Sequence, residues 1–259
     1  MLNGPCYIVS DLHLGATSRD VEHRFLAFLR TLPRTAGSLV INGDLFDFWF
    51  EWRSVLPRRG FRVLAALADV VDAGVPVLWI AGNHDCWGGE IIRNDAGVDY
   101  HVGAWEGRIA GWQARLEHGD GLRPVEDRRY RALRALLRNR LAIGAMRLLH
   151  PDVGTWLATR SSHASRTHRA RDGGAGLHAV AMTQLARPAA PELLVFGHSH
   201  VATLERGPRR SVYANAGSWM DDSTYLRVTT GQIELRRWGV SAERECLHTI
   251  DRGSEEALA

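Results

Sequence analysis

Five short polar motifs, each directly after a run of mainly apolar residues, constrain this chain more than any other feature. The motifs are Asp11-Leu12-His13, Gly43-Asp44, Gly82-Asn83-His84-Asp85, His118-Gly119-Asp120 and Gly197-His198-Ser199-His200. The apolar runs at residues 7–9, 39–41, 77–80 and 193–196 are typical of buried strands. Open α/β sheets bind their ligands at the carboxyl ends of the strands. We therefore expect the five motifs to converge on one face of the fold.

Length and composition indicate a single domain spanning residues 1–259. The chain has 45% hydrophobic residues, enough to bury a sizeable core. Its three cysteines, Cys6, Cys86 and Cys246, are an odd number at no metal-binding spacing, which argues against a disulfide framework and favours a reducing compartment. The first residues show no signal-peptide pattern, and no uncharged run approaches the length of a membrane span. We expect a cytoplasmic protein.

The formal net charge of +3 is close to neutral for a chain of this size. Arginine is concentrated between residues 123 and 171, where Asp and Glu are sparse. Outside that segment no basic groove with interleaved aromatic residues is evident, so no nucleic-acid partner is expected. No obligate protein partner is predicted.

The alternation of apolar runs and helical patterns predicts a parallel or mixed sheet with helices packed outside it. Helices are expected over residues 21–32, 62–73, 127–149 and 178–186. Further strands are expected over residues 77–81 and 108–117, and edge strands over residues 212–215, 224–228 and 232–236. Residues 123–176 are interpreted as a helical insertion, and residues 252–259 are expected to be frayed.

The side chains of the motifs form a mixed set of oxygen and nitrogen donors. Asp44 can offer its two carboxylate oxygens to two cations, Asn83 adds a neutral oxygen, and the histidines add imidazoles. Such a set suits Mn, Fe, Zn or Co rather than calcium. Two ions roughly 3.5–4 Å apart can clamp a phosphoryl group and supply hydroxide at neutral pH. The motifs therefore predict phosphoester hydrolysis.

In this order the motifs resemble those of the calcineurin-like metallophosphoesterase superfamily, which are D-x-H, GD, GNH-D/E, H-G-D and G-H-x-H. The resemblance spans residues 11–200 and implies a two-sheet α/β/β/α sandwich with helices on both outer faces. It implies one metal held by Asp11, His13, Asp44 and His200, and a second held by Asp44, Asn83, His118 and His198. It also implies that His84 approaches the scissile phosphate and assists the leaving group, while Asp85 holds the His84 ring.

Within the superfamily, the chain resembles the UDP-2,3-diacylglucosamine hydrolases of lipid A biosynthesis. Residues 10–15 and 42–49 are similar to that family's DLHL and GDLF-x-x-W stretches, and residues 216–219 to its glycine-tryptophan turn. The insertion after Asp120 lies where those enzymes carry a lid. His84 is the departure, because proteobacterial members have arginine there. The histidine favours membership of the second branch of this hydrolase family, which keeps histidine at this position, or of a related group of lipid or nucleotide phosphoesterases.

This second resemblance implies that two divalent ions, Mn²⁺ or else Fe or Zn, support cleavage of the diphosphate of UDP-2,3-diacylglucosamine to UMP and 2,3-diacylglucosamine 1-phosphate. It implies that this lipid-linked nucleotide is bound by Asn83, Asp127, Tyr130, Ser161, Ser162 and Arg166. Asp127 can equally be a charge at a helix start. The alternative function is a phosphodiesterase or phosphatase acting on another phospholipid or a soluble nucleotide. A scaffold without activity is disfavoured, because no ligand of the motif set is missing.

The insertion carries an apolar stripe beside a basic one. Its apolar positions are Leu133, Leu136, Leu137, Leu141, Met146 and Leu149, and its basic positions are Arg131, Arg134, Arg138 and Arg147. The stripe is typical of a helix packed on a core. It also suits a groove for acyl chains, with the arginines on an anionic surface at the inner face of the cytoplasmic membrane. Nearby, Trp49 and Trp52 can either wall the site or fill the core.

Overall fold

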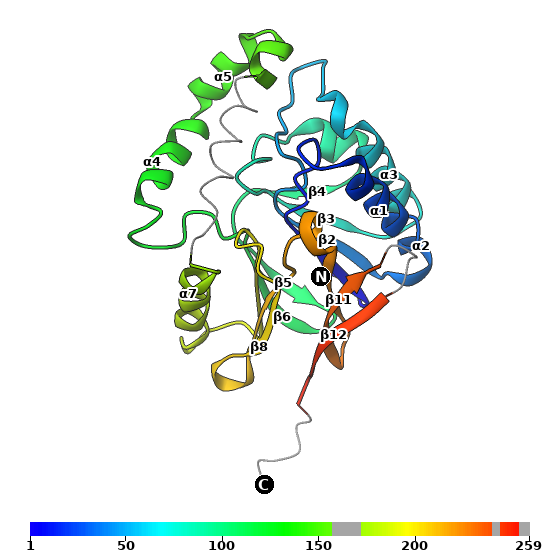
Figure 1. The fold of residues 1–259 in the computed structure, drawn as a ribbon, viewed down its shortest axis with the longest axis vertical. Helices are drawn as coiled ribbons and strands as arrows, with labels where there is room; N and C mark the ends of the chain where they lie inside the picture. The colour runs from blue at the N-terminus through cyan, green and yellow to red at the C-terminus, as the bar shows by residue number, and fades with distance from the viewer. Residues whose placement is uncertain (157–171, 240–243, 254–259) are drawn as a thin grey trace.

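Two β-sheets packed face to face, with helices on both outer sides, make up the body of the molecule (Figure 1). This computed structural model describes residues 1–156, 172–239 and 244–253. The predicted two-sheet sandwich is confirmed. Within the described residues, no helix is both long and apolar enough to cross a lipid bilayer.

The larger sheet has seven strands in the order β12-β11-β10-β1-β2-β3-β4. Their bounds are β1 Cys6–Val9, β2 Ser38–Asn42, β3 Val77–Ile80, β4 Asp99–His101, β10 Thr224–Val228, β11 Gln232–Trp238 and β12 Arg244–Asp251. Strands β1 to β4 are parallel, and β10 to β12 add antiparallel pairs. Every residue of β1, β2 and β3 is buried, as expected for parallel strands covered on both faces.

The smaller sheet has five strands in the order β5-β6-β7-β9-β8. Their bounds are β5 Trp105–Ile109, β6 Trp112–Leu116, β7 Leu193–Phe196, β8 Thr203–Arg206 and β9 Val212–Asn215. The single strand predicted over residues 108–117 is wrong, because Ala110 and Gly111 both have positive φ and turn the chain into a hairpin. The predicted edge positions of β9, β10 and β11 are also wrong, since each strand has a neighbour on both sides.

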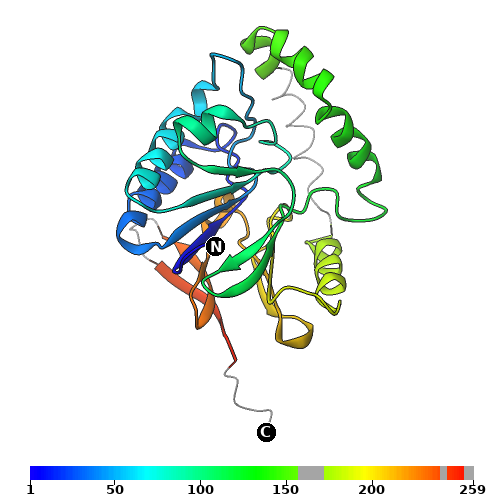
Figure 2. The same ribbon diagram turned by 180° about the vertical axis from the view of Figure 1, so that it is seen from behind.

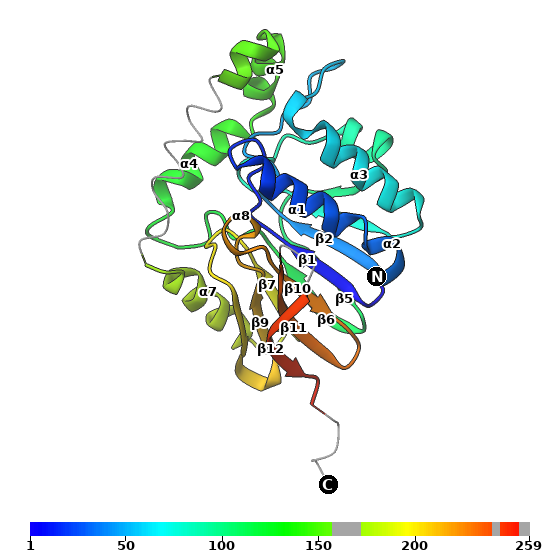
Figure 3. The ribbon, with the colours of Figure 1, turned by 45° about the vertical axis from the view of Figure 1, so that its right-hand side comes forward.

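Helices cover the outer face of each sheet. The elements are α1 Arg19–Leu29, α2 Leu32–Thr35, α3 Phe61–Asp72, α7 Ala175–Leu185 and α8 Trp219–Asp222, with short turns η1 Arg58–Gly60, η2 Ile91–Asp95 and η3 Pro208–Arg210. Helices α1 and α3 lie on the larger sheet and α7 on the smaller one (Figure 3). The predicted helix over residues 21–32 ends early, and Pro33 lies in the first turn of α2, where its missing N–H costs no hydrogen bond.

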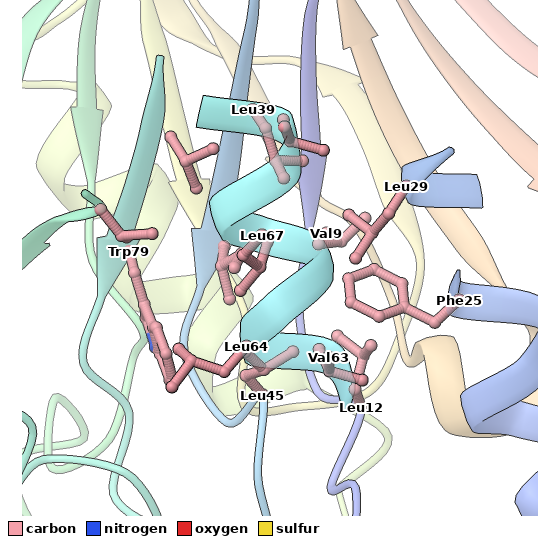
Figure 4. Packing of buried hydrophobic residues seen from close by; sticks show 14 of the residues in the cluster. Val9, Leu12, Phe25, Leu29, Leu39, Leu45, Val63, Leu64, Leu67 and Trp79 are labelled. Atoms are coloured by element: carbon pink, nitrogen blue, oxygen red, sulfur yellow. The ribbon is translucent and has the colours of Figure 1, made fainter. Parts of the chain in front are cut away.

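Three apolar clusters hold the layers together. The first lies between the larger sheet and its helices, the second between the sheets, and the third under α7. In the first cluster, Leu64 and Leu67 of α3 point toward the sheet beside Trp79 and Val9 (Figure 4). Trp49 belongs to the first cluster and stacks on Phe46, so it fills core, whereas Trp52 is buried against Phe50 outside the three clusters.

Helices α4 Arg128–Leu137 and α5 Arg140–Leu148 stand beyond one end of the sandwich (Figures 1 and 2). The single helix predicted over residues 127–149 is therefore wrong. The chain breaks at Asn139, whose side chain accepts the N–H of Leu141 at 2.8 Å and starts α5 as an N-cap. Neither helix buries a residue, and Leu136 and Leu141 are 62% and 84% exposed. The core-packed interpretation of the apolar stripe is wrong for these described residues.

Candidate metal centre

The five polar motifs meet because five parallel-running strands end at the same side of the sandwich. Strands β1, β2 and β3 end before Asp11, Asp44 and Asn83, and strands β6 and β7 of the other sheet end before His118 and His198. Hydrogen bonds tie the loops across the two sheets. His198 N donates to Asp11 Oδ2 at 3.0 Å, and the His118 ring to the Asn42 carbonyl at 2.9 Å.

The first donor group consists of Asp11, His13 and His200. The Nε2 atoms of His13 and His200 face each other at 3.3 Å, and Asp11 Oδ1 lies 3.3 Å from His200 Nε2 and 4.0 Å from His13 Nε2. Asp11 is fully buried, yet among the described residues its Oδ1 accepts no hydrogen bond. A buried carboxylate oxygen without a donor is costly. A cation between these three atoms would remove that cost.

The second donor group consists of Asp44, His118 and His198, with Asn83 beside them. His118 Nε2 lies 3.1 Å from Asp44 Oδ2 and 3.2 Å from Asn83 Oδ1. The His118 and His198 rings meet edge to face with centroids 5.2 Å apart. Because the Asn42 carbonyl can only accept, His118 Nδ1 carries the proton of that bond and Nε2 is directed to the two oxygens. A metal would take the position of a proton on Nε2.

Asp44 lies between the two groups. Its Oδ2 is 3.1 Å from His118 Nε2 and 3.8 Å from His13 Nε2, and its Oδ1 accepts the backbone N–H of His84 at 2.9 Å. The structure thus brings together all seven residues predicted as ligands, with the Asp44 carboxylate in the middle. Carboxylate, amide and imidazole donors at this density fit two divalent cations of intermediate hardness.

Buried opposite charges shift the pKa values of the donors. Burial raises the pKa of both Asp11 and Asp44, but the nearby imidazoles lower it by more. The pKa of Asp11 is therefore lowered to about 2, and that of Asp44 lies well below its usual range. Burial lowers the pKa of His118, but the Asp44 carboxylate outweighs it and holds that pKa well above its usual value. Burial lowers the pKa of His13 to about 4. His13 is therefore a neutral imidazole with a lone pair available for a metal.

The backbone at this site is strained. Positive φ values between 46° and 63° occur at Asp11, His13, Asp44, His198 and His200. Residues other than glycine rarely adopt this conformation, which costs of order 1–3 kcal/mol each and is typical of functional sites. Five such residues among the seven donors indicate that the loops are shaped to aim side chains inward rather than to be stable by themselves.

Two groups lie on the outer sides of the imidazoles. The Asn42 carbonyl fixes the His118 ring, and Asp221 of α8 lies 3.7 Å from His200 Nδ1. The hydrogen bond to the Asn42 carbonyl holds the His118 tautomer that presents Nε2 to a metal, whereas Asp221 adds a nearby negative charge beside His200. Neither residue was predicted from the sequence. Asp221 follows Trp219 in the predicted turn, which is a weak signal, and a backbone carbonyl gives none.

The predicted role of Asp85 is wrong. Its two carboxylate oxygens accept the backbone N–H groups of Gly82 and Leu45, at 2.7 and 2.8 Å. The ring of His84 is held by the carbonyl of Asp47, which accepts from Nδ1 at 2.9 Å. Asp85 therefore fixes the loop that carries Asn83. Its burial, with the nearby Asp44 charge, raises its pKa to about 7.

The residues predicted to bind substrate are placed as follows. Asp127 accepts three hydrogen bonds from Arg123 at 2.7–3.0 Å and precedes α4, and Tyr130 donates to Asp120 Oδ2 at 2.7 Å. Their contact with substrate stays a prediction. Ser161, Ser162 and Arg166 lie outside the described residues.

Asp120 connects the insertion to the metal loops, a role that the sequence did not indicate. It is buried, and besides Tyr130 its Oδ2 accepts from Arg134 Nη1 at 3.3 Å. At the other end of α4, Trp87 Nε1 donates to the Leu137 carbonyl at 3.0 Å. Helix α4 is thus attached to the loop after His118 and to the loop after Asp85.

The chain is similar to known proteins over most of its length. The family described as Calcineurin-like phosphoesterase matches residues 4–202. A UDP-2,3-diacylglucosamine hydrolase of Porphyromonas gingivalis is 35% identical over 164 residues, which are 62% of this chain and 63% of that protein. The same-named protein of Stutzerimonas stutzeri is 32% identical over 243 residues, or 93% of this chain and 96% of the relative. Among solved structures, Vacuolar Protein Sorting 29 of Cryptosporidium parvum aligns over 96% of this chain and 97% of its own, with 11% identity and a TM-score of 0.49.

We expect Gly82→Ala to lose bound metal, because a Cβ at Gly82 would lie 2.1 Å from Asp44 Oδ1 and displace the central carboxylate. The measurement is elemental analysis of the purified variant after incubation with manganese. Gly144→Ala is the matched control, since a Cβ there meets nothing within 4 Å. Full metal content in a folded Gly82→Ala protein would contradict this assignment of Asp44.

Proposed function

Because the chain belongs to the calcineurin-like phosphoesterase family, we propose that it hydrolyses the diphosphate of UDP-2,3-diacylglucosamine to UMP and 2,3-diacylglucosamine 1-phosphate. It is a metal-dependent phosphoester hydrolase. One observation gives the main support for a lipid substrate. The apolar surface of α4 and α5 is exposed, and α4 is attached to the two loops that flank the metal donors. The full-length similarity to a UDP-2,3-diacylglucosamine hydrolase supports the same substrate.

Two divalent ions, with Mn²⁺ proposed as the physiological one and Fe or Zn as alternatives, would be held by the seven donors. Asp11, His13, Asp44 and His200 would hold one, and Asp44, Asn83, His118 and His198 the other. When bound, such ions neutralise phosphate charge and make hydroxide available at neutral pH. The protein's own part is to keep the donors in place. The N–H of His84 holds the buried Asp44 carboxylate, and the Asn42 carbonyl holds the His118 ring.

His84 is the proposed acid for the leaving group. The Asp47 carbonyl accepts a hydrogen bond from Nδ1–H, and Nε2 is the ring nitrogen proposed to meet a phosphate oxygen. The ring lies edge to face against that of His13, with centroids 4.8 Å apart, which places it next to the first donor group. A proton on Nε2 can then pass to the departing oxygen.

The insertion is the proposed lipid-binding part. Leu136, Leu141 and Leu148 are 62%, 84% and 89% exposed, which is unusual for large apolar side chains of one helix pair. They suit acyl chains, and the arginines of the same helices suit an anionic membrane surface. We propose peripheral contact with the inner face of the cytoplasmic membrane, and recognition of the sugar or nucleotide by Asp127, Tyr130, Ser161, Ser162 and Arg166.

The direct test is release of UMP from UDP-2,3-diacylglucosamine by the purified protein with manganese. We expect UMP from the wild type and at least an approximately 100-fold lower rate from Asp44→Asn, since even loss of a ligand's outer partner costs 10–100-fold. Metal content should fall in parallel. Absence of UMP together with rapid cleavage of a simple aryl phosphodiester would remove the substrate proposal and favour another phospholipid or a soluble nucleotide.

His84→Ala should separate catalysis from metal binding. Because His84 is assigned a proton and no metal, turnover should fall by about 10²–10⁴-fold, the usual contribution of a general acid. Metal content should stay at the wild-type level by elemental analysis. An equal loss of metal and activity would instead make His84 a ligand. In His84→Arg, preserved lipid hydrolysis would show that a fixed positive charge can replace the proton donor.

Replacing exposed leucines should lower the rate of hydrolysis of the lipid substrate alone. In the double variant Leu136→Gln and Leu141→Gln, UMP release in mixed micelles should fall about tenfold or more, since each leucine contributes about 1.5–3 kcal/mol when buried by acyl chains. Cleavage of an aryl phosphodiester should be unchanged. Phe61→Gln on α3, where Phe61 is 63% exposed, is the control. An unchanged lipid rate would argue that these helices do not contact the substrate.

A further inference from the structure

A second charged site lies at the opposite end of the smaller sheet from the metal donors. It is a cavity of about 630 Å³ lined by the end of α7, the turn η3 and the residues just after β12. Trp112 at the start of β6 lines it, whereas His118 follows the end of the same strand. At about 3.3 Å per residue, the two sites are about 20 Å apart.

The lining of this cavity is strongly basic. Five arginines and a single carboxylate contribute to it, namely Arg187, Arg206, Arg209, Arg210, Arg252 and Glu192. Only Arg252 is paired with the carboxylate, since its Nη2 lies 2.8 Å from Glu192 Oε1. Among the described residues, no carboxylate lies within ion-pair distance of the other four arginines. The chain as a whole is nearly neutral, so this concentration of charge is local.

The backbone that presents two of these arginines is strained. Arg209 and Arg210 have φ of 55° and 62°, two consecutive positive values at residues with large side chains. This conformation costs of order 1–3 kcal/mol per residue and is typical of binding sites. No other two consecutive non-glycine residues have positive φ in the part of the chain that the structure describes. The turn therefore resembles the metal loops in using strain to direct side chains.

Other contacts hold the arginines while leaving donor groups for a ligand. Arg209 Nη1 donates to the Arg187 carbonyl, and Arg206 Nη2 to the Asp251 carbonyl. The Arg252 guanidinium lies over the Trp112 ring, 4.8 Å from its centroid. Each guanidinium has five N–H donors, and these contacts use only a few of them.

We propose that this cavity binds a phosphate-bearing anion at a site separate from the metal centre. Guanidinium groups match phosphate oxygens with two parallel hydrogen bonds, and unpaired arginines in a concave site favour a doubly charged group over a carboxylate. The volume admits a diphosphate or a phosphorylated headgroup, and both present the same chemistry to the arginines.

The test is calorimetric titration of the manganese-loaded protein with methylenediphosphonate, whose P–C–P bridge resists hydrolysis. We expect two binding sites in the wild type. In the double variant Arg209→Asn and Arg210→Asn, the cavity site should weaken at least about tenfold in Kd, about 1.4 kcal/mol. Asparagine tolerates positive φ, so the turn should keep its shape. Phosphodiesterase activity should be unchanged, and Asp44→Asn should keep the cavity site.

Controls identify the source of the anion. The double variant Arg34→Gln and Arg62→Gln removes the same charge from exposed positions elsewhere and should bind like the wild type. Sedimentation with phosphatidylglycerol vesicles, against phosphatidylcholine vesicles, shows whether a lipid headgroup is the ligand. If the variant with both Arg209 and Arg210 replaced loses vesicle binding, the ligand is a lipid headgroup. If it loses only diphosphonate binding, the ligand is a free phosphate compound. If neither binding changes, the proposal is wrong.

Discussion

The site depends on one buried carboxylate, that of Asp44, held between imidazoles that come from both sheets. Such a group is costly to bury unless donors or cations surround it. Here it accepts one backbone N–H from the loop of His84 and lies 3.1 Å from His118 Nε2. The glycines beside it are required by space, because a Cβ at Gly82 or Gly43 would lie little more than 2 Å from Asp44 or His118. The motif glycines thus let two sheets approach closely enough to share one group of ligands.

The body of the fold could be predicted where the sequence reports burial directly. Strands β1, β2, β3 and β7 are covered on both faces, so they appear as continuous apolar runs. Strand β12 was not predicted, since most of its residues are exposed and its side chains show no apolar pattern. The β5–β6 hairpin was read as one strand because Ala110 gives no turn signal, although its φ is positive. Exposed strands and irregular turns depend on tertiary contacts that a local pattern does not contain.

In the candidate site, too, some parts could be predicted from the sequence and others could not. Side chains able to donate to a metal have distinctive types and spacings, so all seven candidate donors could be named from the sequence. Their supports could not, because those of His118 and His84 are backbone carbonyls, which every residue has. The assumption that Asp85 orients the neighbouring ring failed for this reason. An aspartate next to a histidine suggests a pair, but the two N–H groups of Gly82 and Leu45 satisfy its carboxylate first.

The insertion is attached directly to the loops that carry the candidate metal donors. Asp120 belongs to the same loop as His118, and it binds Tyr130 and Arg134 of α4, so the helix and a proposed ligand share one short segment of backbone. Trp87 attaches the end of α4 to the loop that carries Asn83. A ligand that covers the exposed leucines would therefore be linked to both halves of the donor set through these hydrogen bonds. The proposed apolar binding at α4 and α5 and the proposed phosphate chemistry at the donors would then share one surface, as an amphiphilic phosphoester requires.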